Sequence, residues 1–191
     1  MVKLRSGLVF MLLCLSGCQT VYQGGAPSLL GTDGVPCDGQ VAAPAGWREV
    51  NDDALLKMAL GATDKGGICA GKVFEATQAT RVYRVWDSRY ATSRLGKWWA
   101  LDQPESPREA YRANYAICPD WSALDEETAC MLQPGSRIVL GTTQSASCGS
   151  FIYPKTAWLQ VYVNPQGASV ESMLNACDAD QSWPVAGTAG K

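Results

Sequence analysis

The sequence predicts a single compact α+β domain, stapled by disulfide bonds, with a mixed or antiparallel sheet and three to four short helices. Helical and strand-like patterns follow one another in the order helix, strands, helices, strands, which does not fit the regular alternation of a parallel βαβ fold. Six cysteines are scattered through the part of the chain that remains after export. A length of 191 residues with 47% hydrophobic residues suits one well-formed core.

The first helix is expected to begin at residues 51–53. Asn51 can cap its amino end, and the two aspartates that follow suit the positive end of the helix dipole. Apolar residues then recur with helical spacing at Leu55, Met58, Ala59 and Ala62. Three glycines from position 61 onward end this helix.

Strands are predicted where β-branched and aromatic residues concentrate. These segments are residues 72–86, 97–101, 137–142 and 157–163.

Further helices are expected in the second half of the chain. Residues 106–109, Ser-Pro-Arg-Glu, have the form of a capping box with proline at the first helical position. They predict a helix that continues to Ile117. Two shorter helices, over residues 124–132 and 169–176, complete the prediction.

The amino-terminal residues 1–17 have the pattern of a secretory signal peptide. Two basic residues precede an apolar run of eight, which as a helix spans only about 12 Å and is too short to cross a bilayer. Residues 18–46 are rich in Gly, Ala, Pro and Ser and predict a flexible tether. The globular domain is then expected at 47–181, followed by a loose tail at 182–191.

The segment Leu15-Ser16-Gly17-Cys18 resembles the lipobox of bacterial lipoproteins. The resemblance implies a diacylglycerol on the Cys18 sulfur, cleavage before Cys18 and acylation of the new amino group, which together hold the chain on a membrane. Residue 19 is Gln rather than the Asp that favours the inner membrane. The implied location is the bacterial cell envelope, at the outer membrane facing the periplasm. An ordinary cleaved signal with a chance cysteine is the alternative.

Charge and composition exclude several function classes. Cleavage after residue 17 removes two of the 16 basic residues and none of the 18 acidic ones, so the mature chain has a formal charge of −4. A nucleic-acid partner is therefore not expected. Histidine is absent, which excludes His-based triads and His-ligated zinc, and no metal site or obligatory cofactor is predicted. The chain also lacks a P-loop and the other common phosphate-binding and nucleophile motifs.

The cysteines predict three disulfide bonds. Of the eight, Cys14 leaves with the signal peptide and Cys18 is lipidated. The remaining six have no C-x-x-C spacing, and an exported protein favours their oxidation: Cys37, Cys69, Cys118, Cys130, Cys148 and Cys177. Fifteen pairings are possible, and a reactive thiol among the six cysteines is the alternative to three disulfide bonds.

Two predicted strands carry candidate ligand-binding residues. Alternation places Arg84 between Val82 and Trp86 on one face. An arginine with such neighbours is expected to be partly buried and to need a carboxylate, backbone carbonyls or an anionic ligand as a partner.

In the last long strand, Leu159, Val161 and Val163 form a core face, and the opposite face presents Trp158, Gln160 and Tyr162. Two aromatic rings around one amide suit a contact surface for a small molecule or peptide. A face covered by another element of the same domain is the alternative.

Residues 82–89, Val-Tyr-Arg-Val-Trp-Asp-Ser-Arg, resemble the first strand of cholera- and pertussis-type ADP-ribosyltransferase subunits. Those carry a Tyr-Arg-x-Asp-Ser-Arg pattern, and one extra residue separates Arg84 from Asp87 here. The resemblance implies NAD as the substrate, Arg84 in its pocket and Thr142-Thr143 in place of a supporting Ser-Thr-Ser strand. Gln160 stands where the family has a catalytic Glu, and some NAD-hydrolysing toxins use Gln there.

The sequence thus favours an envelope lipoprotein that binds a protein, a cell-wall component or a small molecule. The alternative is an ADP-ribosyltransferase-like or NAD glycohydrolase-like domain, in which Arg84 and Gln160 are the candidate catalytic residues. A single cleft lined by both would favour the alternative.

Overall fold

The computed structural model describes residues 29–105, 107–165 and 167–184. The signal peptide, Cys18 and the first part of the predicted tether lie outside these residues, as does the tail from 185 onward. No helix within the described ranges is long and apolar enough to cross a membrane.

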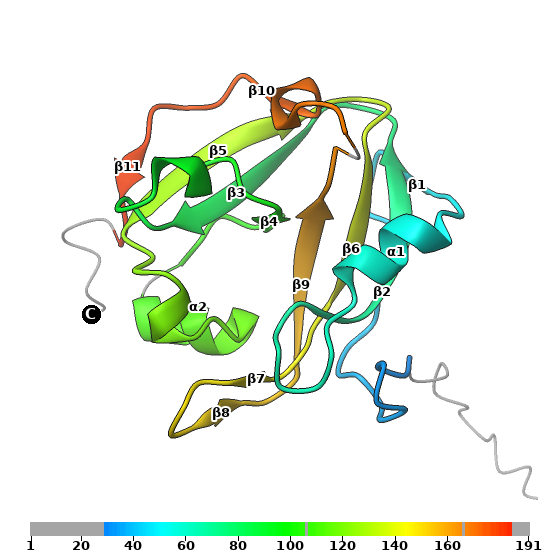
Figure 1. Cartoon of the computed structure of the whole chain (residues 1–191). Helices are drawn as coiled ribbons and strands as arrows, with labels where there is room; N and C mark the ends of the chain where they lie inside the picture. The colour runs from blue at the N-terminus through cyan, green and yellow to red at the C-terminus, as the bar shows by residue number, and fades with distance from the viewer. Residues whose placement is uncertain (1–28, 106, 166, 185–191) are drawn as a thin grey trace, which may run out of the picture.

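Two antiparallel sheets form the framework of the domain (Figure 1). The first has five strands in the order β1 (Trp47–Glu49), β2 (Ile68–Ala76), β6 (Arg137–Thr143), β9 (Thr156–Val163) and β4 (Trp98–Trp99). The second is centred on β5 (Glu126–Leu132), which pairs with β3 (Thr80–Trp86), β10 (Leu174–Asn175) and β11 (Gln181–Ser182). A small hairpin joins β7 (Ala146–Ser147) to β8 (Ile152–Tyr153).

The segment after β4 links the two sheets. Trp98 and Trp99 pair with β9 of the first sheet, and Ala100 then forms a bridge with Tyr83 in β3 of the second. The main core fills the space between the sheets, with fully buried Phe74, Val82 and Leu140 among its members.

Two α-helices cover the sheets. Helix α1 (Asp53–Ala59) packs Leu55 and Ala59 on the outer face of β2, β6 and β9. Its amino end is capped by Asp52, whose side chain accepts from the Leu55 amide at 3.0 Å, rather than by Asn51. Helix α2 (Arg108–Tyr115) buries Tyr111 and Tyr115 beside β3. Short 3-10 turns lie at Ala91–Ser93, Pro119–Trp121 and Val170–Ser172.

The prediction of three to four helices was wrong, since the described residues hold two α-helices. Residues 124–132 form β5 instead of a helix, and Val170–Ser172 followed by β10 replaces the predicted helix over 169–176. In β5 the buried Thr128, Cys130 and Leu132 alternate along one face, and seven residues pair in register with β3. Sheet pairing thus outweighs helix propensity here.

Both ends of the domain extend further than predicted. Within the expected tether, Cys37 is bonded to Cys69 and Val41 is buried in the core. At the other end, Ser182 pairs with Glu126 in β5, and the Trp183 ring packs on Tyr111 with centroids 5.1 Å apart. The ordered chain therefore begins before residue 47 and continues past 181.

Six cysteines form three disulfide bonds, as predicted. The pairs are Cys37–Cys69, Cys118–Cys148 and Cys130–Cys177. Each joins segments that lie far apart in sequence.

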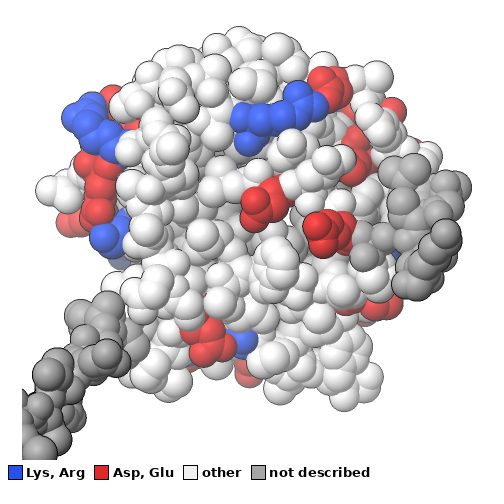
Figure 2. Space-filling view, turned by 180° about the vertical axis from the view of Figure 1, so that it is seen from behind, with Lys and Arg blue, Asp and Glu red and all other residues white. Residues whose placement is uncertain are grey.

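Surface charge is mixed on the face shown in Figure 2. Lys and Arg side chains and Asp and Glu side chains occur there in small groups among uncharged ones, so this face presents no continuous basic surface.

An ionic contact holds the amino-terminal segment on the domain. The Asp33 carboxylate accepts from Lys155 Nζ at 2.9 and 3.1 Å and from Thr63 at 2.9 Å. Together with the Val35 amide, these donors lower the pKa of Asp33 to about 2. Because the folded pKa is depressed, the carboxylate stabilises the fold above the ordinary aspartate pKa, and this contribution is lost as the pH falls from about 4 towards 2.

We therefore expect Asp33→Asn to flatten the dependence of unfolding free energy on pH between about 5 and 2. Urea unfolding at a series of pH values measures it. Asp38→Asn, which changes an exposed carboxylate with no side-chain partner in the described structure, is the matched control. If the free energy of unfolding depends on pH equally steeply in Asp33→Asn and in the parent chain, the stabilising role assigned to the Asp33 carboxylate is wrong.

Candidate functional site

A cavity of about 580 Å³ lies where the two sheets meet the ends of both helices. The carboxyl end of α1 and the loop that follows it form one wall. The chain from Tyr115 to Leu124 forms another, and β3, β4 and β9 each contribute one or two side chains. Arg84 and Gln160 both line this cavity, although their strands belong to different sheets.

Arg84 is largely buried and is held by backbone carbonyls. Its Nε donates to Ser93 O at 2.7 Å and its Nη1 to Trp98 O at 2.6 Å. No carboxylate of the described residues forms an ion pair with it, so it is not the structural ion pair considered above. Burial lowers the pKa of Arg84 to about 10, which leaves it charged at neutral pH. Its Nη2 has no hydrogen-bond partner in the described part of the chain and is not sealed from solvent.

Gln160 has a hydrogen-bond acceptor without a partner among the described residues, whereas Arg84 has a donor without one. Its Nε2 donates to Thr143 Oγ1 at 2.9 Å and to Gly67 O at 3.3 Å. These contacts fix the amide, with its oxygen left without a donor among the described residues. The residues that line the cavity therefore include both a cationic donor, Arg84, and an amide acceptor, Gln160.

The other three candidate residues lie elsewhere. Trp86 is buried in the second sheet and donates to Thr128 Oγ1 at 3.2 Å. Tyr162 is covered by α1 and packs on Trp98, with centroids 4.8 Å apart. Trp158 is 44% exposed and packs on Tyr115 outside this cavity. The predicted polar-aromatic face of β9 is thus covered at Gln160 and Tyr162, and only Trp158 reaches the surface.

The two threonines that the resemblance implied, Thr142 and Thr143, differ in their hydrogen bonds. Thr143 contacts Gln160 directly, and its Oγ1 also donates to Trp158 O at 2.9 Å. The Thr142 hydroxyl is buried with no hydrogen-bond partner in the described structure.

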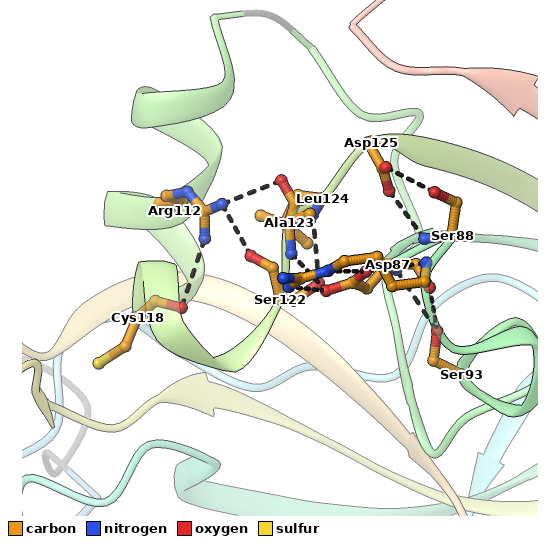
Figure 3. A network of polar contacts seen from close by, with 10 residues as sticks. Asp87, Ser88, Ser93, Arg112, Cys118, Ser122, Ala123, Leu124 and Asp125 are labelled. Atoms are coloured by element: carbon orange, nitrogen blue, oxygen red, sulfur yellow. Dashed lines mark hydrogen bonds and ion pairs between the residues drawn. The ribbon is translucent and has the colours of Figure 1, made fainter.

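The end of the motif at 82–89 supports the cavity wall rather than lining it (Figure 3). The buried Asp87 carboxylate accepts from Arg89 Nε and Nη2 at 2.9 and 2.6 Å, and from the Ala123 amide at 2.8 Å. Arg89 and Ala123 lower the pKa of Asp87 far below the usual aspartate range. Beside it, Asp125 accepts from the Ser88 amide and hydroxyl at 2.8 and 2.6 Å. These bonds tie the 122–125 segment to the end of β3.

Arg112, on helix α2, holds the 122–125 segment of the same wall through hydrogen bonds to its carbonyl groups (Figure 3). Its guanidinium Nη2 donates to Ser122 O at 2.8 Å and to Ala123 O at 3.0 Å, and Nη1 lies 3.4 Å from two further carbonyls, Ile117 and Cys118. Burial lowers its pKa. The Cys118–Cys148 disulfide then fastens this loop to the β7–β8 hairpin.

Some of the lining could not be assigned from the sequence. Gly66 has φ +71°, and a Cβ there would lie 3.0 Å from Trp121, so close approach requires glycine at this position. The three glycines after α1 were interpreted only as a helix end, yet they bring the backbone against the cavity. Trp98 and Tyr115 line it from β4 and α2.

No cluster of metal-ligating side chains is found among the described residues. The chain matches no protein-family model, no curated protein and no solved structure.

Proposed function

We propose that this domain is a small-molecule binding module of the cell envelope, with the cavity between α1, α2 and the two sheets as its site. The observation that carries the proposal is that Arg84 and Gln160 line one cavity and that each keeps one polar atom, Nη2 and Oε1, without a hydrogen-bond partner among the described residues. A buried charge that is only partly satisfied favours an anionic partner.

The size and lining define the ligand class. A volume of about 580 Å³ lies in the range usual for small-molecule sites, about 300–1,000 Å³. Arg84 suits a phosphate or carboxylate oxygen, and Gln160 suits an N–H or O–H donor. Trp98, Tyr115 and Trp121 supply aromatic walls. The expected ligand carries a flat ring, a hydrogen-bond donor and an anionic group.

A second candidate function is an ADP-ribosyltransferase-like or NAD glycohydrolase-like activity on NAD. The specific support is that the two residues matched to that family's NAD pocket, Arg84 and Gln160, line the same cavity. In this function Arg84 holds an anionic oxygen of NAD. Gln160, a neutral amide, orients a ribose hydroxyl or the attacking water but supplies no negative charge to the transition state.

The proposed location rests on the lipobox. Acylation of Cys18 places the domain on the envelope membrane, where a protein or a cell-wall component is a further possible partner. Changing Cys18 to Ser should block lipidation and release the protein from the membrane fraction. Continued cleavage at Gly17 with unchanged sedimentation would refute the anchor.

Titration calorimetry with NAD and with ADP-ribose tests the ligand class. We expect saturable binding that Arg84→Lys weakens by about tenfold or more, because lysine keeps the charge and loses the planar fork. Arg81→Lys is the matched control, since Arg81 lies on the same strand and contacts Asp178 at the surface.

A nicotinamide-release assay with the same protein separates the two functions. Binding without release supports the module, and release that Gln160→Met abolishes supports the second candidate. If neither NAD nor ADP-ribose binds, nor inorganic phosphate, the cavity does not take a phosphate-bearing ligand, and if acetate and benzoate also fail to bind, the proposed anionic ligand class is wrong.

A further inference from the structure

A second hollow, of about 450 Å³, lies on the other side of Tyr115 from the cavity described above. Its lining combines three aromatic rings with two carboxylates: Tyr111, Tyr115, Trp158, Asp102 and Glu105. Among the described residues, no lysine or arginine lines it. The sign of the charged side chains thus distinguishes it from the Arg84 cavity, which is lined by Lys65 and Arg84.

The aromatic rings form a continuous corner. Tyr111 and Tyr115 lie with ring centroids 4.6 Å apart, and Tyr115 and Trp158 with centroids 5.8 Å apart, all at tilted angles. Both tyrosines are buried, whereas Trp158 is one of the exposed large hydrophobic side chains of the domain. Trp158 is exposed and packs on the buried Tyr115 ring, so it can contact a ligand without any rearrangement of the core.

The two carboxylates are uncompensated. Neither Asp102 nor Glu105 forms an ion pair with a described lysine or arginine. Asp102 and Trp158 also line a second, more open hollow next to this one. Burial raises the pKa of the Tyr115 hydroxyl, and the negative charge of Asp102 raises it slightly further. The Tyr115 side chain therefore stays neutral.

We propose that this hollow binds a small organic cation of the quaternary ammonium class, held over the rings of Tyr115 and Trp158 and balanced by Asp102 and Glu105. Aromatic faces attract such cations through their quadrupole, and methylated ammonium groups lose little hydration on entry. The carboxylates repel an anionic ligand, and a neutral ligand gains no charge pairing from them. The site is independent of the Arg84 cavity, although the two share Tyr115.

Choline is the probe, and 3,3-dimethyl-1-butanol, which replaces its nitrogen by carbon, is the neutral isostere. With the purified full-length chain, we expect choline to bind saturably and the isostere to bind at least about tenfold more weakly. Ring currents should shift the trimethylammonium proton resonance upfield in the bound state. Equal binding of both compounds, or no binding of choline, would overturn the proposal.

Two variants locate the site. Trp158→Leu and Asp102→Asn should each weaken choline binding by about fivefold or more, since both change exposed side chains and leave the core intact. Phe151→Leu and Glu171→Gln make matched changes at exposed residues outside the hollow and should bind choline as the parent does. If the two controls lose as much affinity as the two site variants, choline binds elsewhere. Binding of choline phosphate lipids as well as free choline would identify a headgroup source, and binding of free choline alone a soluble one.

Discussion

Arg112→Met is expected to lower the free energy of unfolding by about 3 kcal/mol and to abolish ligand binding in the Arg84 cavity. The guanidinium is 4% exposed and serves carbonyls of the loop that forms one cavity wall. Methionine fills a similar volume but leaves those carbonyls without donors, and burying unsatisfied acceptors is costly. The loop must then open so that water can donate hydrogen bonds to these carbonyls. Denaturant unfolding and calorimetry measure the two effects.

Arg112→Lys should recover only part of the loss, because one ammonium cannot reach the carbonyls on both sides of the planar group. Arg48→Met is the control, since Arg48 forms an exposed pair with Glu75 and such pairs contribute roughly 0–1 kcal/mol. If Arg112→Met lowers the free energy of unfolding as little as Arg48→Met does, the loop keeps its shape without the guanidinium.

Removal of the Cys130–Cys177 disulfide, by changing both cysteines to alanine, is expected to destabilise the domain by about 4 kcal/mol. The bond closes a sequence separation of 47 residues, and chain-entropy loss in the unfolded state grows with loop length. Cys130 lies on the β5 strand within the main core. Neither cysteine lines the Arg84 cavity, so ligand affinity at that site should not change once the fold is intact.

The Cys118–Cys148 bond provides the matched comparison. It closes 30 residues and should cost somewhat less stability by the same argument. Unlike the first bond, it fastens the cavity wall, so its removal should also weaken ligand binding. Thermal melts of both double variants, with binding measured at low temperature, separate these outcomes. Equal binding losses in the two variants would mean that the bonds act only through global stability.

Local sequence patterns predicted much of the secondary structure. The helix that begins at Asp53 and the helix after Pro107 form close to the predicted positions, but their caps differ: Asp52 rather than Asn51 caps the first, and Pro107 stands at the N-cap of the second without a side-chain capping bond. The strands around Arg137 and Val161 form where β-branched residues concentrate. These signals are short-range, because caps, periodicity and β-branching act over a few neighbouring residues.

The pattern failed where long-range pairing decides the structure. Residues 126–132 contain a helix-compatible mixture, yet β3 on one side and the carboxyl-terminal strands on the other make them the centre of a sheet. A single sequence carries no record of those partners. The expected tether and tail were misjudged for the same reason, since Cys69 and Tyr111 hold them in place from far along the chain.

For the candidate sites, the sequence by itself determined the residue types: an arginine among apolar neighbours, a glutamine among aromatic ones, and six cysteines able to form three bonds. Alternation along a strand is enough to identify such side chains. Only the tertiary structure decided that Arg84 and Gln160 line one cavity, that Tyr162 is covered by α1 and that Trp158 lines one hollow with two carboxylates. Strand periodicity specifies the face of a side chain within its own sheet, whereas the meeting of two faces depends on how separate sheets and helices pack around the core.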